Sequence, residues 1–224
     1  MKRIIILVVI LIALLCALFL VFTYTTIHAP FAAPTQNFSM TTEQINENTA
    51  AYFITAQYPQ FGIPAIDAQI KQTVETAADD IRTAAANPPD SAVLQNTFQG
   101  SFDKVYVGPD IISVELILSE YTGGAHGLTV FRGMNFDRSS GRVLSLTDAL
   151  SLTGLSLPQV AAQANAQLQQ QLGSGFQFTD GASATAENYS EFLVNEKNVT
   201  FIFEEYQVAA YAAGVQYVTI ARKP

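Results

Sequence analysis

The sequence has few residues of the kinds that usually form covalent cross-links or metal sites. Its 224 residues include one cysteine, two histidines and no tryptophan. The cysteine, Cys16, lies in an apolar N-terminal stretch, so the rest of the chain has no disulfide and must be held together by its core. His28 lies in a stretch that reads as a linker, so no two-histidine metal site is available. We therefore predict neither a metal nor a cofactor.

Positive charge is also scarce, with 11 Lys and Arg residues against 19 Asp and Glu residues. Lys2 and Arg3 precede the apolar stretch, which leaves nine basic residues against 19 acidic ones and a net charge of −10 for the remainder. Nucleic acid requires a basic surface, so we exclude it as a partner. An acidic domain suits a cationic partner, although such charge also simply keeps a protein soluble.

Residues 4–22 carry no charge and consist mainly of Ile, Leu, Val and Phe. As a helix this run would cover roughly 28 Å, close to the hydrocarbon core of a bilayer. Lys2 and Arg3 come before it and no basic residue follows until Lys71, so the positive-inside rule places the N-terminus in the cytoplasm. We predict a cytoplasmic stub at 1–3, a single-pass cell-membrane anchor at 4–22 and an extracytoplasmic remainder. A cleaved signal peptide is the main alternative.

The rest of the chain divides into a linker and one domain. Residues 23–44 are rich in Thr, Ala, Pro and Asn without hydrophobic periodicity, which is typical of a linker. Residues 45–224 are enough for one sizeable core. An apolar stripe predicts an amphipathic helix over 66–81, a capping box at Ser156 and Gln159 opens a second, and Thr147-Asp148 indicates a short helical turn. Strands are predicted at 51–58, 102–107, 111–120, 128–136, 192–194, 199–203 and 215–221.

Short loops join most of the predicted strands in pairs. Such pairing indicates an α+β fold with a mainly antiparallel sheet and two amphipathic helices, preceded by one N-terminal transmembrane helix.

A glycine-rich loop, Tyr121-Thr-Gly-Gly-Ala-His-Gly127, is the first candidate site. It is neither a dinucleotide fingerprint nor a P-loop. In the functional interpretation, Tyr121, Gly123, Gly124 and His126 contact a ligand, or His126 acts as a base. The alternative is that the glycines only form the turn and His126 bonds to the backbone.

The carboxylates of Glu120 and Asp137 are near His126 in the sequence and are its candidate catalytic partners. A triad of Ser119, His126 and Asp137 can be written, but no nucleophile elbow accompanies it, so no complete catalytic motif is present. Glu204 and Glu205 are adjacent on a predicted strand, so they should point to opposite faces and not form an acid–base pair.

Tyr206 and Tyr211 are further ligand-binding candidates, because tyrosine suits recognition surfaces. The alternative interpretation makes them half-buried strand residues.

Three ordered motifs together resemble one known extracellular domain. They are Tyr121 to Gly127, Asn135-Phe136-Asp137 with Ser140-Gly141, and Phe201 to Gly214. The module they resemble is shared by the RsiV anti-sigma factor and the non-catalytic part of the PdaC peptidoglycan deacetylase. The likeness covers 42–221 and departs from the family at Ala210, where proline is usual.

The resemblance implies an α+β fold of two intertwined halves, outside a bacterial cell and near its wall. In RsiV-like proteins this module is a lysozyme receptor, but no contact residue carries over to this sequence. Three residues precede the apolar run, and the sequence stops at Pro224. We therefore expect neither a sigma-factor-binding segment nor a deacetylase domain.

The leading hypothesis is a membrane-tethered extracytoplasmic binding module of the cell envelope that recognises a lysozyme-like protein or peptidoglycan. One alternative is a cell-wall hydrolase or deacetylase-associated enzyme that uses the His126 loop. Another is an envelope scaffold without a small ligand.

Overall fold

The computed structural model describes residues 39–86 and 95–223. The predicted stub at 1–3 and anchor at 4–22 lie outside these ranges, as does most of the predicted linker. Within the described ranges, no helix combines the length and the apolar character that crossing a membrane requires.

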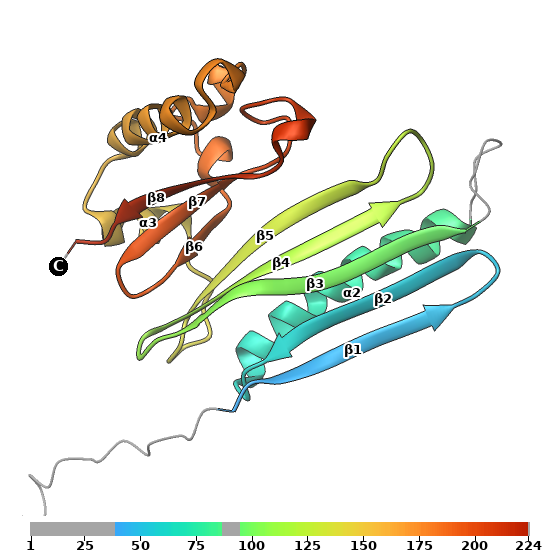
Figure 1. Ribbon diagram of the computed structural model, residues 1–224. Coiled ribbons are helices and arrows are strands. Elements are labelled where there is room, and N and C mark those ends of the chain that lie inside the picture. Colours follow the sequence, from blue (N-terminus) through green and yellow to red (C-terminus); the bar gives the residue numbers. More distant parts are fainter. Residues whose placement is uncertain (1–38, 87–94, 224) are drawn as a thin grey trace, which may run out of the picture. The chain divides into compact units, whose positions relative to one another are not determined.

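Eight strands form two sheets in this part of the chain (Figure 1). The five-stranded sheet has the order β1-β2-β3-β4-β5, and the three-stranded sheet has the order β6-β7-β8. The strands of the first sheet are β1 (Thr41–Asn48), β2 (Tyr52–Gln60), β3 (Asn96–Val107), β4 (Ile111–Tyr121) and β5 (Leu128–Asp137). Those of the second are β6 (Phe192–Val194), β7 (Asn198–Phe203) and β8 (Gln216–Ala221).

Every neighbouring pair of strands is antiparallel except β2 and β3, which are parallel. A parallel pair needs a crossover, and α2 (Pro64–Ala86) lies between these two strands in the sequence. The predicted α+β fold with a mainly antiparallel sheet is therefore confirmed.

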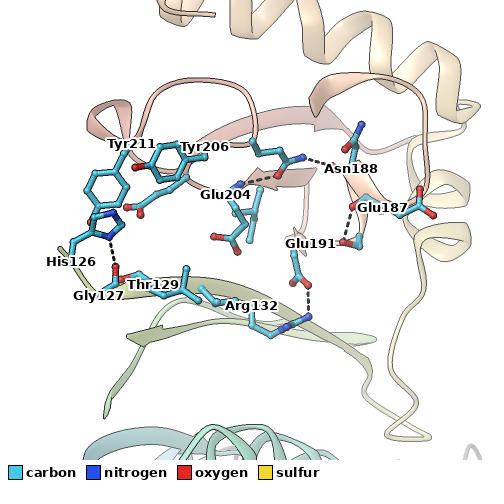
Figure 2. Close-up of a pocket in the computed structure, with 16 residues that line it drawn as sticks. His126, Gly127, Thr129, Arg132, Glu187, Asn188, Glu191, Glu204, Tyr206 and Tyr211 are labelled. Carbon is cyan, nitrogen blue, oxygen red and sulfur yellow. Dashed lines mark hydrogen bonds and ion pairs between the residues drawn. The ribbon is translucent and has the colours of Figure 1, made fainter. Parts of the chain in front are cut away.

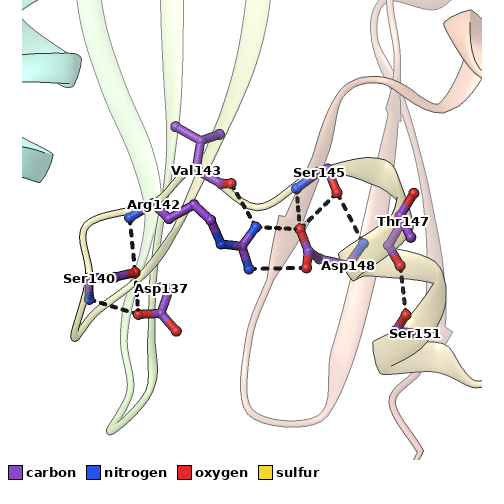
Figure 3. A network of polar contacts seen from close by, with 8 residues as sticks. All are labelled: Asp137, Ser140, Arg142, Val143, Ser145, Thr147, Asp148 and Ser151. Carbon is purple, nitrogen blue, oxygen red and sulfur yellow. Dashed lines mark hydrogen bonds and ion pairs between the residues drawn. The ribbon is translucent and has the colours of Figure 1, made fainter.

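Three α-helices are present among the described residues, where the sequence predicted two. Besides α2 and α4 (Leu157–Leu172), the short turn expected at Thr147-Asp148 is a full helix, α3 (Leu146–Thr153). Its N-cap is Ser145, whose hydroxyl accepts from the Asp148 amide while the Asp148 carboxylate accepts from the Ser145 amide (Figure 3). This capping box uses Asp where Glu or Gln is usual, which hid it in the sequence.

Strand β1 begins at Thr41, inside the stretch that the sequence predicted as a linker. Most of its residues are exposed and polar, because it lies at the edge of its sheet and pairs with β2 alone. An exposed edge strand of this composition has no apolar alternation, so hydrophobic periodicity cannot detect it.

The core of the five-stranded sheet lies beneath α2, which runs along one face of the sheet (Figure 1). The helix buries a stripe at spacings of three and four residues, namely Ile66, Ile70, Val74, Ala78 and Ile81. The even-numbered residues of β2 and β4 supply the facing surface: Ile54, Ala56, Ile112, Val114 and Leu116. A second core gathers α3, α4 and the three-stranded sheet.

Sheet-to-sheet contact buries the other face of β4 as well. Ser113 and Glu115 are 0% exposed although their positions alternate with apolar ones. The Ser113 hydroxyl donates to Asn135 Oδ1 over 2.7 Å, and that oxygen also accepts the Val194 amide of β6 at 2.9 Å. Polar side chains of β4 and β5 thus bond directly to the second sheet.

Glu115 forms a second link between the sheets. It accepts the Tyr217 hydroxyl of β8 at 2.9 Å and forms an ion pair with Lys104 of β3. Burial opposes the charge of Lys104, but hydrogen bonds to Glu115 and Tyr217 outweigh it and raise the Lys104 pKa. Burial raises the pKa of Tyr217 to about 12, which keeps its proton available to Glu115.

Replacing Glu115 by alanine should therefore destabilise the domain strongly. Removing the fully buried carboxylate leaves Tyr217 and Lys104 without their partner, but Lys104 is 40% exposed and water can hydrate it, so we expect a loss of about 1–3 kcal/mol. Urea denaturation of Glu115→Ala would measure this loss. The matched control is Asp79→Ala, which removes a carboxylate 69% exposed and should change the unfolding free energy by less than about 1 kcal/mol. Equal effects of the two substitutions would contradict the assignment.

Candidate functional site

A cavity of about 330 Å³ lies along the outer edge of β5, where it faces β7 and the loop that follows it (Figure 2). We call it the β5 cleft. One wall comes from β5 and the glycine-rich loop before it, and the other from the segments before β6 and after β7. Its lining comprises His126 to Val130, Arg132, Glu187, Asn188, Ser190, Glu191, Ile202, Glu204 to Gln207 and Tyr211.

The backbone of β5 determines how the carboxylates of the cleft are placed. As the last strand of its sheet, β5 has outward amides without a strand partner. The Phe131 amide donates to Glu204 Oε1 at 2.8 Å, and the Gly133 amide donates to Glu191 Oε2 at 2.9 Å. The side chains of Glu204, which follows β7, and Glu191, which precedes β6, thus satisfy backbone amides at the edge of the five-stranded sheet.

Gly133 is required for this approach. A Cβ at this position would lie 2.0 Å from the Phe192 carbonyl oxygen, well inside contact distance. Any other residue would separate β5 from β6.

Glu204 has the most strongly perturbed acidity in the cleft. Burial raises the pKa of Glu204 to about 7, although the hydrogen bond from the Phe131 amide and the charge of Arg132 act in the opposite direction. The negative charges of Glu191 and Glu205 add to the rise. The group therefore changes its charge near neutral pH.

Glu191 is more fully compensated than Glu204. Its Oε1 forms an ion pair with Arg132 Nη1 at 2.6 Å, in addition to the Gly133 amide on its other oxygen. Burial nevertheless raises its pKa, with Arg132 and Gly133 opposing the shift.

Three aromatic rings stack at one end of the cleft (Figure 2). The ring centroids of His126 and Tyr211 are 4.6 Å apart, and those of Tyr211 and Tyr206 are 5.4 Å apart, with interplanar angles of 23° and 30°. Tyr206 is 56% exposed and Tyr211 is 38% exposed, so the stack offers its surface to solvent. We call these three residues the ring stack.

Backbone geometry positions the rings. Tyr206 has φ +66, which is unusual for a residue other than glycine. The Gln207 side chain holds the turn, because its Oε1 accepts the Glu204 amide and its Nε2 donates to the Gly181 carbonyl, both at 2.9 Å. Tyr211 begins a short 3-10 turn that ends at Gly214 with φ +67.

The structure brings together three predicted ligand-binding residues from two separate motifs, His126 from the first and Tyr206 and Tyr211 from the second. His126 is exposed, and its Nδ1 hydrogen-bonds to the Gly127 carbonyl oxygen at 2.8 Å. Tyr121, Gly123 and Gly124 do not line the cleft. The Tyr121 hydroxyl donates to the Gly124 carbonyl at 2.9 Å, and both glycines have positive φ, so these residues shape the turn.

The two candidate catalytic carboxylates do not join His126. Asp137 pairs with Ile111 at the far end of β5, about 30 Å along the strand from Leu128. There it accepts hydrogen bonds from Ser139 and Ser140, which lower its pKa to about 2 and stabilise a turn. Figure 3 shows the contact with Ser140. Glu120 pairs with Leu128 and lines two other hollows, one between α2 and the sheet and one shared with Gly127 and Tyr211, and neither is lined by His126. The Ser119, His126 and Asp137 triad is not assembled.

Three residues of the cleft were missed in the sequence, namely Arg132, Glu191 and Glu204. Glu204 and Glu205 were expected to be strand residues whose side chains point to opposite faces, although the predicted strand, like β7, ends at Phe203; both residues line the cleft. A turn after the strand removes the alternation that the expectation assumed. The sequence signal was a pair of acids directly after an apolar run.

A metal site has no ligand set in the part of the chain that the structure describes. No three or more His, Cys, Asp or Glu side chains gather there in positions that could hold an ion.

Comparison with known proteins finds likeness in both halves of the domain. A family model described as "Deacetylase PdaC" matches residues 45–129, and one described as "Protein of unknown function (DUF3298)" matches residues 150–223. Residues 45–129 are thus similar to PdaC, and residues 150–223 are similar to proteins of the DUF3298 family. The β5 cleft takes residues from both matched segments of this PdaC-like domain, His126 to Thr129 from the first and Glu187 to Tyr211 from the second.

A curated relative is the peptidoglycan-N-acetylmuramic acid deacetylase PdaC of Bacillus subtilis strain 168, with 24% identity over 169 residues. The match covers 74% of this chain and 36% of the relative, so the PdaC-like chain spans about a third of the relative's length. The resemblance to PdaC predicted from the motifs is confirmed, while the likeness to RsiV stays a prediction.

Two crystal structures share the fold of the PdaC-like domain. A DUF3298 family protein from Pseudomonas aeruginosa has a TM-score of 0.53 at 18% identity, covering 83% of this chain and 95% of its own. A DUF3298 family member from Bacteroides fragilis has a TM-score of 0.50 at 18% identity, covering 83% and 90%.

The acidity of Glu204 predicts how stability depends on pH. Its pKa rises from 4.5 to about 7 on folding, so the folded state binds more protons and stability falls as pH rises from about 4.5 through 7. Glu204→Gln keeps an oxygen that can accept the Phe131 amide, and because glutamine does not ionise, the variant does not lose this stability as pH rises. We expect the variant's Tm to match the native one at pH 5 and exceed it at pH 8, by about 2–4 °C for each 1 kcal/mol relieved.

Thermal unfolding followed by circular dichroism at both pH values would measure this difference. The control is Glu196→Gln, an exposed carboxylate outside the cleft, which should follow the native pH dependence. Parallel curves for Glu204→Gln and the native protein would refute the assignment.

Ala210 yields a separate prediction, because proline is expected there from the family resemblance. Its φ is −63 and its ψ is 153, values that proline adopts without strain. Ala210→Pro should stiffen the unfolded chain and raise the unfolding free energy by about 0.4–1 kcal/mol. Ala213→Pro is the contrasting variant, since it removes an amide that donates to the Ala210 carbonyl at 2.8 Å, and it should destabilise. Denaturant titration would measure the unfolding free energy of both variants. A change of the same sign in the two would contradict the prediction.

Proposed function

We propose that this domain is an extracytoplasmic cell-wall module whose β5 cleft binds the glycan of peptidoglycan. The similarity of the chain to PdaC, a peptidoglycan deacetylase, supports a cell-wall-associated module. The single observation that carries the choice of glycan is the exposed ring stack beside the carboxylates of the same cleft.

The chemistry of a sugar matches these two features. A pyranose has an apolar C–H face, which packs against aromatic rings, and hydroxyl groups around its rim. Carboxylates such as Glu204 and Glu205 accept hydrogen bonds from those hydroxyls. The cleft's volume of about 330 Å³ is at the lower end for small-ligand pockets, so it suits a short segment of a glycan chain.

Binding is favoured over catalysis because the backbone of β5 occupies the two perturbed carboxylates. Glu191 and Glu204 each accept an amide of the strand, as expected of groups that hold the two sheets together. Glycan hydrolysis is the second candidate, because a carboxyl group with a pKa near 7 suits a general acid. Release of reducing ends from peptidoglycan, lost in Glu204→Gln, would favour hydrolysis.

We also propose that residues 4–22 tether the domain to the outer face of the cell membrane. The uncharged run and the preceding Lys2 and Arg3 support this. Partition of the full-length chain with membranes, and loss of that partition on deleting 4–22, is the expected result. Release of a shortened soluble chain would favour signal-peptide cleavage instead.

The glycan proposal predicts that Tyr206→Ala weakens binding of muropeptides about 2- to 10-fold, because one ring contact is worth about 0.5–1.5 kcal/mol. Calorimetry on the full-length chain, in a detergent without a sugar head group, would measure it. Tyr206 is largely exposed, so folding should be retained. The control is Phe178→Ala, an aromatic residue 43% exposed outside the cleft, which should leave affinity unchanged.

Lysozyme serves as the competing ligand in the same experiment, since the acidic domain also suits a cationic protein. Binding of lysozyme without any binding of muropeptides would replace the glycan proposal.

A further inference from the structure

The charges of the β5 cleft are unbalanced. Four carboxylates line it, from Glu187, Glu191, Glu204 and Glu205, against the single guanidinium of Arg132. Arg132 is already paired with Glu191 at 2.6 Å. Among the ion pairs of the described residues, none includes Glu204.

A neutral ligand would make this imbalance worse. It would displace water from Glu204 and Glu205 without supplying charge, and removing water from an uncompensated carboxylate costs free energy. A ligand that carries one positive charge would instead supply the missing partner. An ammonium group has three N–H donors and no acceptor, which matches a wall of acceptors.

The ring stack limits which cation fits. Tyr206 is two residues from Glu204, and its ring, 56% exposed, stacks on Tyr211 at the same mouth of the cleft. The ligand must therefore present a flat apolar face and a positive charge within one small unit. A lysine side chain carries the charge on a narrow flexible stem and leaves the ring stack uncovered. A hexosamine with a free amine has both features in a single ring.

We propose that the β5 cleft recognises an amino sugar whose nitrogen carries no acetyl group, with its ammonium against Glu204 and its ring face on Tyr206 and Tyr211. This inference rests on the proposed glycan-binding function and specifies the ligand's chemical class. The domain would then distinguish de-N-acetylated glycan from the acetylated form.

Proton release provides a signature specific to this arrangement. Glu204, with a pKa of about 7, faces Glu191, Glu205 and Arg132, and His126 lies across the cleft. An ammonium against Glu204 favours its ionised form, so binding at pH 6 should expel up to about one proton. A sugar bound without its charge at Glu204 would leave the protonation unchanged.

The test uses the full-length chain in a detergent without a sugar head group at pH 6. It is titrated with fully deacetylated glucosamine tetramers and with N-acetylated tetramers. Calorimetry in two buffers of different ionisation enthalpy counts the protons released. We expect the deacetylated tetramer to bind at least about 10-fold more tightly, to release a proton, and to lose affinity in 0.5 M salt.

Two variants separate the charge contact from a general loss of structure. Glu204→Gln should abolish both the preference and the proton release while its melting curve shows a folded protein. Glu196→Gln, outside the cleft, should retain both. Retention of the preference in Glu204→Gln would overturn the assigned contact.

The remaining outcomes distinguish this inference from the function beneath it. Equal binding of the two tetramers, or tighter binding of the acetylated one, overturns the inference and leaves the glycan-binding function standing. If a folded chain binds neither tetramer and no muropeptide, the two proposals are overturned together. Nα-acetyl-lysine amide carries a free side-chain ammonium. If it binds as tightly as the deacetylated tetramer, the ammonium alone is recognised and the sugar is rejected as the ligand.

Discussion

The structure depends on how the outer edge of β5 is satisfied. An edge strand presents amides that need partners, and here those partners come from the segments around the second sheet. Glu204 bonds the Phe131 amide, Glu191 bonds the Gly133 amide, and Asn135 reaches the Phe192 carbonyl at 2.6 Å. Because these contacts join the two sheets, they also create the cleft between them.

The same contacts give the cleft its chemistry. A carboxylate that caps a strand edge must lie partly out of water, and burial raises its pKa. Arg132 compensates Glu191, whereas Glu204 has only the amide of Phe131 and, with a pKa of about 7, is about half ionised near neutral pH. Structural support and an unbalanced charge therefore come from one residue, so a ligand that neutralises Glu204 would also strengthen the contact between the sheets.

Much of the secondary structure could be predicted from hydrophobic periodicity, including α2, α4 and the strands from β2 onward, although the prediction at 102–107 missed the first half of β3 (Asn96–Val107). The failures have physical reasons. β1 is an exposed polar edge strand, and α3 is capped by Ser145 and Asp148 in an unusual variant of the capping box. The ring stack was partly foreseen, because His126, Tyr206 and Tyr211 stand in recognisable motifs. The contacts of Glu191 and Glu204 with β5 could not be foreseen, since no local pattern relates these residues to that strand.

By itself, the sequence determined most of the helices and strands, the acidic character, the PdaC likeness and the glycine-rich turn that presents His126, because these depend on local periodicity, composition and backbone freedom. Tertiary structure alone decided which side chains meet. Residues from 126 to 132 lie opposite residues from 187 to 211 only because β5 packs against the segments that flank the three-stranded sheet. Gly133 allows β5 to approach β6 closely. It also separated Asp137 from His126 along β5, since an extended strand holds its two ends far apart.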